Sequence, residues 1–279
     1  MNRQRTKRPI VLYVLLLLLV TTGFFHATLE VRHRSTDTVF VKAAGEPASI
    51  KVMTYNIRHA KGLDGHVDLG AVIKEIVQAD PHIVALQEVD RLNVRSGFVD
   101  QIARLGEALD MHWAYAPTMG VFVTEYGNAV LSKFPIISSQ MFLLPGKSEA
   151  RNAMQVLVDA YGQPLNIWNT HLGQSSEDRQ RQIPVLVELT KESEAPYIVM
   201  GDFNMDTAHS ALQPSLDSWR HISIEEATHI SGKRLDHLFI SDEVELIDRG
   251  IVKGTASDHF PVIASLRLPD ASSGKSLNR

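Results

Sequence analysis

The 279-residue chain contains no cysteine. Disulfide scaffolds, thiolate zinc sites, iron–sulfur clusters and cysteine nucleophiles are therefore excluded at once. Any metal that this protein binds must be held by oxygen atoms or by imidazole nitrogens. The remaining composition is ordinary for a globular chain, with 44% hydrophobic and 22% charged residues, so neither disorder nor a collagen-like repeat dominates the sequence.

An excess of positive charge is also missing. The chain has 28 Lys and Arg residues against 32 Asp and Glu residues, which gives a formal net charge of −4 at pH 7. A protein that relies mainly on non-specific attraction to nucleic-acid phosphates is usually basic. Residues 48–268 contain no Lys/Arg-rich stripe interleaved with aromatic residues. The charge pattern therefore disfavours nucleic acid as the main partner.

The first 27 residues have the pattern of a targeting segment. Four cationic residues between Arg3 and Arg8 precede an uninterrupted run of 16 apolar or small residues from Ile10 to Phe25. A membrane span needs ~20 such residues, with a lower limit of ~17. We expect residues 1–27 to be either an uncleaved signal-anchor or a cleaved signal peptide. Because the cationic end stays in the cytoplasm, the rest is expected at the outer face of the cell membrane or secreted.

Three further regions follow this segment. Residues 28–47 are mixed and polar, and we expect them to form a stalk. Residues 48–268 are predicted to form one catalytic α/β domain. The tail, residues 269–279, is polar and small, and is expected to be disordered.

Within residues 48–268, apolar runs typical of strands alternate with helical periodicity. Residues 50–57 and 82–89 are predicted strands, and residues 69–78 have the spacing of an amphipathic helix. The residues predicted to share one helix face are Leu69, Val72, Ile73, Ile76 and Val77. Strands outnumber helices and several look antiparallel, which predicts two packed sheets with helices outside.

Several predicted strands end in a polar residue that does not fit a core. These residues are Asn56, Glu88, His171, Asp202 with Asn204, Asp236, and Asp258 with His259. Taken singly, each has an ordinary explanation, such as a turn-forming asparagine or a solvated strand end. Six such ends in one domain, rich in carboxylate and imidazole, are hard to explain by chance. If the strand ends converge, they form one polar pocket.

The residue types in this set indicate hydrolysis assisted by an oxygen-ligated metal. The Glu88 carboxylate and the Asn56 amide oxygen suit Mg²⁺ or Mn²⁺, which are hard ions that prefer oxygen. An Asp or His residue of the set would then orient or deprotonate an attacking water. A second His and an Asn amide would donate hydrogen bonds to phosphate oxygens as negative charge builds.

In this order, the residues lie in motifs that resemble those of the endonuclease/exonuclease/phosphatase superfamily, which includes deoxyribonuclease I, exonuclease III-type endonucleases and neutral sphingomyelinases. The resemblance covers about Ile50 to Leu266. Its motifs are MTYNIR (53–58), LQEVD (86–90), GNAVLSKFP (127–135), NTHL (169–172), GDFN (201–204), RLDHLFIS (234–241) and SDHFPV (257–262). GDFN, SDH and LQEV together are specific, whereas any one of them alone would be weak.

The resemblance implies a four-layer α/β sandwich, with two mostly antiparallel sheets flanked by helices and the site at one end. It implies metal ligation by Glu88, with Asn56 as a nearby ligand or support, and Mg²⁺ or Mn²⁺ as the cofactor. Asp202 and Asn204 match the pair that positions the nucleophile and the phosphate.

The other motif residues have implied roles in phosphate binding and proton transfer. His171 matches a phosphate-contacting histidine, and His259 matches the terminal catalytic histidine, with Asp258 as the acid beside it. Asp236 matches an acid that orients a histidine partner. The motif leaves open whether Asp202 or His259 is the base.

Two residues and two loops are candidates for substrate contacts. Asn128 lies near the site in the family, although it also suits the plain start of a strand. Arg151 follows the 143–152 loop and is a candidate contact for a second phosphate oxygen. The aromatic-rich segment 111–127 is a candidate substrate loop, although most of its rings suit core packing.

We expect an exported phosphodiesterase or phosphatase that acts on lipid-linked, sugar or other small phosphate esters. The alternative is an extracellular nuclease with the same core, since acidic members of the superfamily degrade DNA. A third, catalytically inactive binding module is disfavoured because every core motif residue is present. The expected partners are the phosphate ester and, through the N-terminal segment, a membrane, with no obligate protein partner.

Overall fold

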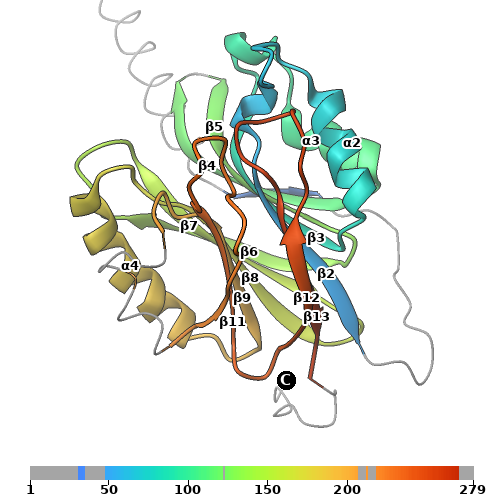
Figure 1. Cartoon of the computed structure of the whole chain (residues 1–279), viewed down its shortest axis with the longest axis vertical. Coiled ribbons are helices and arrows are strands. Elements are labelled where there is room, and N and C mark those ends of the chain that lie inside the picture. Colours follow the sequence, from blue (N-terminus) through green and yellow to red (C-terminus); the bar gives the residue numbers. More distant parts are fainter. Residues whose placement is uncertain (1–30, 35–47, 122, 207–211, 213–217, 270–279) are drawn as a thin grey trace, which may run out of the picture.

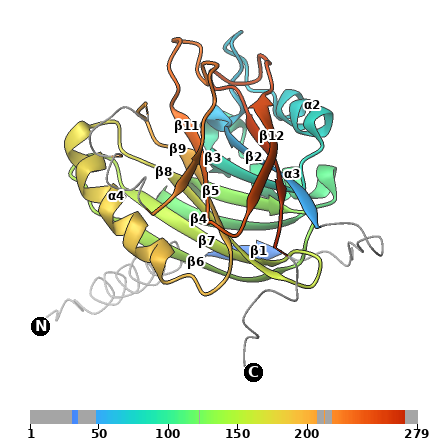
Figure 2. The same cartoon turned by 60° about the horizontal axis from the view of Figure 1, so that its bottom comes forward.

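Two β-sheets lie face to face, and helices cover their outer faces (Figures 1 and 2). The computed structural model describes residues 31–34, 48–121, 123–206, 212 and 218–269. Among these residues, no helix is both long and apolar enough to cross a membrane. The segment predicted for residues 1–27 and nearly all of the predicted tail lie outside the described residues.

The seven-stranded sheet combines the first and the last strands of the domain. Its order is β1 (Arg32–Arg34), β4 (His112–Val121), β5 (Thr124–Ser132), β3 (Ile83–Arg91), β2 (Ser49–Asn56), β13 (Val262–Arg267) and β12 (Glu245–Ile251). All neighbouring strands in it are antiparallel except β2 and β3. The last strand, β13, therefore lies beside the first strand of the domain, β2.

The six-stranded sheet is built from the middle of the chain. Its order is β10 (Arg220–Ile222), β11 (Asp236–Ile240), β9 (Tyr197–Asp202), β8 (Pro164–His171), β7 (Arg151–Asp159) and β6 (Ile136–Leu144). Only β8 and β9 are parallel in this sheet. The prediction of two mostly antiparallel sheets is therefore confirmed.

A helix joins the two strands of each parallel pair, because parallel neighbours need a crossover connection. Helix α2 (Leu69–Ala79) connects β2 to β3, and α4 (Ser176–Lys191) connects β8 to β9. Helix α3 (Gln101–Leu109) lies beside α2, and two short 3-10 turns, η1 (Arg58–Ala60) and η2 (Val94–Ser96), follow β2 and β3. With the two sheets, these helices form the predicted four-layer α/β sandwich.

Three apolar clusters hold the four layers together. The first fills the space between the sheets, with Val52 and Val262 on one side and Ile167 on the other. The second packs α2 and α3 against the seven-stranded sheet, and the third packs α4 against the six-stranded sheet. Burial of these side chains is the main stabilising contribution to the fold.

Helix α2 begins and ends where its sequence indicates. The Asp68 side chain accepts a hydrogen bond from the backbone N–H of Ala71, and Asp80 ends the helix in a left-handed conformation just before Pro81. The buried face contains Val72, Ile76 and Ala79. Val77 is 59% exposed, so its placement on the buried face was wrong. One residue after Ile76, it lies about 100° further around the helix.

The region expected to be a stalk contributes a strand. Residues 32–34 pair with β4, and the Arg32 guanidinium forms an ion pair with the nearly buried Glu125 carboxylate at 2.7 Å. This part of the 28–47 range therefore belongs to the sheet and is not a free connection. The sequence is too short and too polar here to show a strand by alternation.

A buried polar bridge joins the two sheets close to their centres. The Asn169 amide on β8 donates to the carbonyl oxygens of Leu86 and Ala129 at 2.9 and 2.8 Å, and its oxygen accepts from Gln87 Nε2 at 2.8 Å. Asn169 and Gln87 are fully buried. These bonds fix the position of one sheet relative to the other.

We expect Asn169→Ala to lower the free energy of unfolding by about 3 kcal/mol, because three buried hydrogen bonds are lost and their partners stay buried. Urea titrations followed by circular dichroism measure this change. The matched control is Gln155→Ala, which removes the half-buried amide bond to Asn166 and should cost less than about 1 kcal/mol. Equal losses in both variants would contradict a special role for the bridge.

Candidate active site

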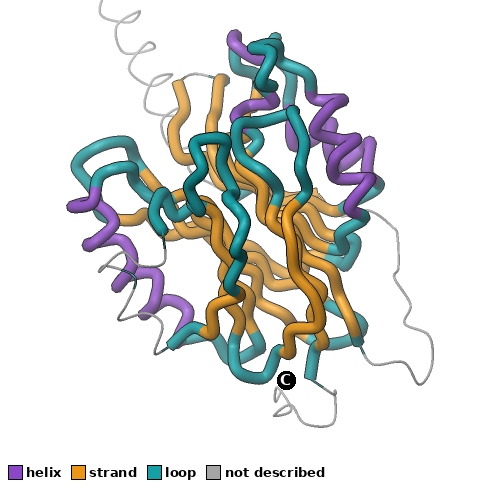
Figure 3. The backbone as a smooth tube through the Cα atoms, viewed as in Figure 1, coloured by secondary structure: helices purple, strands orange, loops and turns teal. Residues whose placement is uncertain are grey.

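The carboxyl ends of the two parallel strand pairs meet at one end of the sandwich. Asn56 ends β2 in one sheet, and His171 and Asp202 end β8 and β9 in the other. Glu88, predicted to end a strand, lies three residues before the end of β3, which continues to Arg91. Strand β2 packs against β9, and β3 packs against both β8 and β9. Long loops follow these strands at the upper end of the molecule in Figure 3. The carboxyl ends of parallel strands are common ligand sites.

Asp202 is at the centre of this group. Its Oδ2 accepts a hydrogen bond from Asn56 Nδ2 at 3.0 Å and lies 3.4 Å from His171 Nε2 and 3.7 Å from His259 Nε2. The preceding Gly201 has a φ of +154°, and a Cβ there would lie 2.0 Å from the Thr170 carbonyl oxygen. Glycine at this position therefore allows β9 to approach β8 and brings Asp202 next to His171.

Asp236 orients His259. The Nδ1 atom of His259 donates to Asp236 Oδ2 at 2.9 Å, and the Thr228 hydroxyl donates to the same oxygen at 2.7 Å. Burial lowers the pKa of His259, but the nearby carboxylates of Asp236 and Asp202 outweigh burial and raise it to about 10. His259 is therefore an imidazolium at neutral pH, with its Nε2–H directed at Asp202.

Protonation of His259 makes the free energy of unfolding depend on pH. The pKa of His259 rises from 6.5 to about 10 on folding, so its stabilising contribution is complete below pH 6.5 and is lost as the pH approaches 10. In metal-free buffer, we expect the unfolding free energy of the wild type to fall over this range relative to that of His259→Gln. Urea titrations at several pH values test this, and parallel curves would contradict it.

The charged groups around His259 define the control for that experiment. Asp202, Asp236 and Asp258 face it as acids, and the His229 ring packs on it with centroids 4.7 Å apart. Asp236→Asn removes the main cause of the raised pKa. That variant should show a smaller dependence on pH than the wild type.

Glu88 is a partly buried acid, 24% exposed, with few compensating partners. A β-bulge between Leu86 and Val89 interrupts the strand, and Glu88 has a left-handed φ of 59° there. Its carboxylate accepts one bond from Asn56 Nδ2 at 3.1 Å, and His59 Nδ1 lies 3.9 Å away. Burial raises the pKa of Glu88, whereas burial lowers the pKa of His59 to about 4 and leaves that ring neutral.

A divalent cation fits this environment. A carboxylate that is partly removed from water and has no cationic partner is stabilised by a bound ion, and carboxylate oxygen is the preferred ligand of Mg²⁺. Asp202, Asp236 and His259 also offer donor atoms within 4.8 Å of one another. Because Asp236 and His259 are already hydrogen-bonded to each other, Glu88 is the better candidate to hold an ion.

Asn56 presents its amide nitrogen to both carboxylates. The nitrogen bridges Glu88 and Asp202, while the amide oxygen accepts from the backbone N–H of Arg58 at 3.0 Å. In this orientation Asn56 spaces the two acids and does not offer oxygen to a cation. Of the two roles expected for Asn56, support therefore fits this geometry better than ligation.

The inner group of the site consists of Asn56, Glu88, His171, Asp202, Asp236 and His259. The other four predicted site residues, which are Asn128, Arg151, Asn204 and Asp258, lie outside it. Asp258 is partly exposed and forms an ion pair with Arg58 at 3.2 Å. The Asn204 amide donates to the Leu172 carbonyl, although its backbone N–H donates to Asp202 Oδ1 at 2.8 Å. Asn128 is buried and donates to Asn152 Oδ1 at 2.9 Å, so it makes a bridge between the sheets.

Arg151 contacts the His171 ring on its Nδ1 side, away from Asp202. Its Nη1 lies 3.3 Å from His171 Nδ1, and its Nη2 donates to Glu149 at 3.0 Å. The buried Nε atom has no hydrogen-bond partner among the described residues. Burial lowers the pKa of His171 to about 3, so this ring is neutral, accepts from Arg151 and carries its proton on Nε2.

Sequence reasoning missed three residues of the site. Thr228 and His229 lie in the loop between β10 and β11, where His229 bridges to His259 and its Nε2 is 4.0 Å from Asp258. Glu75 on α2 accepts from the backbone N–H groups of Thr255 and Ala256, which fastens the loop that carries His259. The sequence holds one signal for these residues: Thr228 and His229 are adjacent polar residues shortly before the RLDHLFIS motif.

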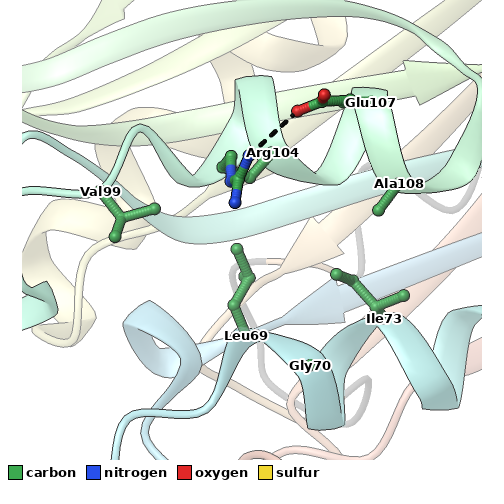
Figure 4. Close-up of a pocket in the computed structure, with 7 residues that line it drawn as sticks. All are labelled: Leu69, Gly70, Ile73, Val99, Arg104, Glu107 and Ala108. Carbon is green, nitrogen blue, oxygen red and sulfur yellow. Dashed lines mark hydrogen bonds and ion pairs between the residues drawn. The ribbon is translucent and has the colours of Figure 1, made fainter.

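A separate cavity of about 540 Å³ lies between α2 and α3 (Figure 4). Its walls are mainly apolar, and its charged lining residues, Arg104 and Glu107, form an exposed ion pair at 3.2 Å. None of the strand-end residues lines it. The cavity therefore does not belong to the polar group described above.

A sandwich that gathers a partly buried glutamate, an Asp–His pair and a second histidine at one end defines a hydrolase of the phosphoester class. The sequence pattern of the Endonuclease/Exonuclease/phosphatase family matches residues 53–259. The chain belongs to this family. Members of the family hydrolyse phosphoric esters, and the protein is a phosphoester hydrolase.

Individual relatives agree with this assignment. Protein cwh43 of Schizosaccharomyces pombe is 28% identical over 218 residues, which cover 70% of this chain but only 22% of cwh43. A crystal structure from Beutenbergia cavernae has a TM-score of 0.71 at 22% identity, covering 80% of this chain and 72% of that one. The human nocturnin catalytic domain with bound sulfate has a TM-score of 0.62 at 20% identity, covering 79% and 95%.

Proposed function

We propose that this protein is a divalent-metal-dependent phosphodiesterase or phosphatase that works outside the cytoplasm. The observation that supports this most strongly is the Glu88 carboxylate, which shares the Asn56 amide with the buried Asp202 at the end of the sandwich. A site that places two acids on one amide suits a cation, a phosphate and an attacking water. The N-terminal cationic and apolar pattern supports export.

Mg²⁺ is the proposed cofactor, with Mn²⁺ as the alternative. Glu88 would hold the ion, and Asn56 would support it or, with its amide turned, add an oxygen ligand. When bound, the ion would neutralise charge on the phosphate oxygens. The remaining steps depend on side chains of the chain itself.

Asp202 is the proposed general base. His259 has Nδ1 engaged by Asp236 and carries a proton on Nε2 at neutral pH, so it is a donor. Asp202 Oδ2 lies between the Nε2 atoms of His171 and His259, and a water there could transfer its proton to that oxygen. His259 would then donate a hydrogen bond, and finally a proton, to the phosphate or the leaving group.

His171 and Arg151 are proposed to bind the phosphate. Neutral His171 offers its Nε2–H at the centre of the site, and Arg151 fixes the ring by donating to Nδ1. A donor fixed at this place stabilises the charge that develops on non-bridging oxygens. The buried Arg151 Nε provides a further donor if the guanidinium shifts toward the substrate.

An extracellular nuclease is the second candidate. In its favour, the fold that this chain shares with ANGEL2, at a TM-score of 0.66 and 16% identity, holds a nucleoside-derived ligand, adenosine-2',3'-vanadate, in that 2',3'-cyclic phosphatase. The acidic net charge of −4 disfavours this reading.

A substrate panel separates the two candidates. The full chain in detergent would be incubated with Mg²⁺, Mn²⁺ or EDTA and with supercoiled DNA, RNA, sphingomyelin, phosphatidylinositol phosphates, bis-p-nitrophenyl phosphate and p-nitrophenyl phosphate. We expect EDTA to abolish turnover, and lipid or small esters to be hydrolysed without nicking of DNA. Nicking would support the nuclease, and activity that persists in EDTA would contradict the metal dependence.

A further inference from the structure

Exposed apolar side chains are concentrated at the active-site end. Among the described residues, thirteen large hydrophobic side chains are exposed, and all but Val77, Ile137 and Ile247 lie in loops or strand ends around the site. Six of them define what we call the apolar rim: Leu63, Val94, Phe98, Val123, Leu143 and Ile230. Their exposed fractions run from 45% at Leu63 to 70% at Val94. A concentration of this kind marks an interaction surface.

The 92–99 loop, directly after the strand that carries Glu88, presents two rim residues in a fixed conformation. Leu92 and Phe98 have left-handed φ values of 50° and 59°, which are unfavourable for bulky residues. The backbone is closed by bonds from Leu92 N to Val99 O and from Phe98 N to Asn93 O. Strain combined with exposure of an apolar ring has no benefit for folding and indicates a function for the loop.

A charged contact keeps this loop beside the active site. Arg95, between Val94 and Phe98, donates to the buried Asp90 carboxylate at 2.8 and 2.7 Å and lies over the Tyr126 ring at 5.2 Å. The two apolar side chains are therefore presented by a loop that is fastened to β3 and β5.

The other rim residues are attached to site loops from both sheets. Ile230 N donates to the Asp258 carbonyl at 2.9 Å, and Leu63 N donates to the Thr255 carbonyl at 2.9 Å. Leu143 pairs with Asn152, next to Arg151, and Val123 lies at the tip of the β4–β5 hairpin. The rim residues therefore belong to loops and strand ends that border the site on several sides.

If residues 10–25 form the proposed membrane segment, the chain that follows them limits the distance of the domain from the membrane. The apolar run ends at Phe25, and the described structure begins at Val31, six residues later. Six residues span at most about 20 Å. Strand β1 runs antiparallel to β4, which leads to the hairpin at the site end, so Arg32 is the end of β1 nearer to the site.

We propose that the apolar rim docks on the surface of a lipid bilayer, so that the active site faces phosphate esters carried by membrane lipids. The catalytic part of this inference rests on the proposed function, whereas the docking part rests on the rim alone. Apolar side chains on a fixed loop can enter the boundary between head groups and acyl chains. A site bordered by them receives a lipid head group without the lipid leaving the membrane.

Docking is tested without reference to catalysis. The full chain with Phe98→Trp is reconstituted in phosphatidylcholine vesicles that contain brominated acyl chains, and Ile247→Trp is the matched control because Ile247 is exposed outside the rim. The native Trp113, Trp168 and Trp219 are at most 9% exposed, so they give a constant background. We expect the tryptophan at position 98 to be quenched at least twofold more than that at position 247.

Equal quenching at the two positions would overturn docking, even in an enzyme that hydrolyses soluble esters. A tryptophan at position 98 that is unquenched by brominated lipid yet blue-shifted with rising protein concentration would also overturn it, in favour of a second copy of the chain. Quenching in a protein that hydrolyses no ester would leave docking standing and refute the proposed function.

The substrate part is tested with Val94→Ser/Phe98→Ser. Turnover of vesicle-borne sphingomyelin or phosphatidylinositol phosphate should fall at least tenfold, while turnover of bis-p-nitrophenyl phosphate stays unchanged. Ile137→Ser/Ile247→Ser, which removes two exposed side chains outside the rim, should alter neither rate. An equal loss on both kinds of substrate, or a wild type that hydrolyses only the soluble ester, would overturn the lipid assignment.

Discussion

Replacing Asp202 by asparagine is expected to lower kcat by a factor of about 10³ or more, because asparagine cannot accept the proton that the attacking water releases. The shape of the side chain is retained, and its one oxygen still accepts a hydrogen bond from Asn56 or from the backbone N–H of Asn204, so the folded structure should persist. Steady-state hydrolysis of bis-p-nitrophenyl phosphate, with circular dichroism to check folding, measures the effect.

Asp206→Asn is the matched control for this experiment. Asp206 is four residues further along the same loop and pairs with Arg234, away from the inner group. Its replacement should leave kcat within about twofold of the wild type, since an exposed ion pair contributes little. A tenfold or smaller loss in Asp202→Asn would transfer the role of base to another group.

Glu88→Gln should remove most of the divalent-cation affinity and lower kcat by about 10² or more at a fixed Mg²⁺ concentration. The change keeps the size of the side chain but removes the charge that an ion would neutralise. Isothermal titration of the metal-free protein with Mn²⁺ measures affinity directly, so that the result does not depend on activity.

Asp258→Asn provides the comparison for Glu88→Gln. Asp258 is an acid of the same pocket, but it is already paired with Arg58 at 3.2 Å. We expect this variant to bind Mn²⁺ almost as the wild type does. If Asp258→Asn lost the ion and Glu88→Gln kept it, the metal would be held by Asp258 and not by Glu88.

The residues at strand ends could be predicted because strands have a simple pattern. An apolar run that stops at a carboxylate or an imidazole is visible in the sequence, and this pattern identified Glu88, His171 and Asp202. The family motifs then implied that these strand ends meet. The structure brings them together because β2 and β3 lie across the core from β8 and β9.

Contacts that depend on how strands and loops are placed relative to one another could not be predicted from the sequence. Asn128 faces Asn152 across the sheets, and Thr228 reaches Asp236 from a loop without periodicity. The orientation of the Asn56 amide is set by the Arg58 backbone N–H, which donates to the amide oxygen and leaves the nitrogen facing the two acids. The pairing of β1 with β4 depends on neighbours about 80 residues away in the chain.

The order of strands in the seven-stranded sheet also governs when the enzyme first becomes active. The final strand, β13, inserts between β2 and β12, pairing Val262 with Thr54, and His259 lies just ahead of it. A ribosome must therefore release almost the whole domain before this sheet can close and the imidazole can reach Asp236. A growing polypeptide therefore has no complete site until its last strand has joined the sheet.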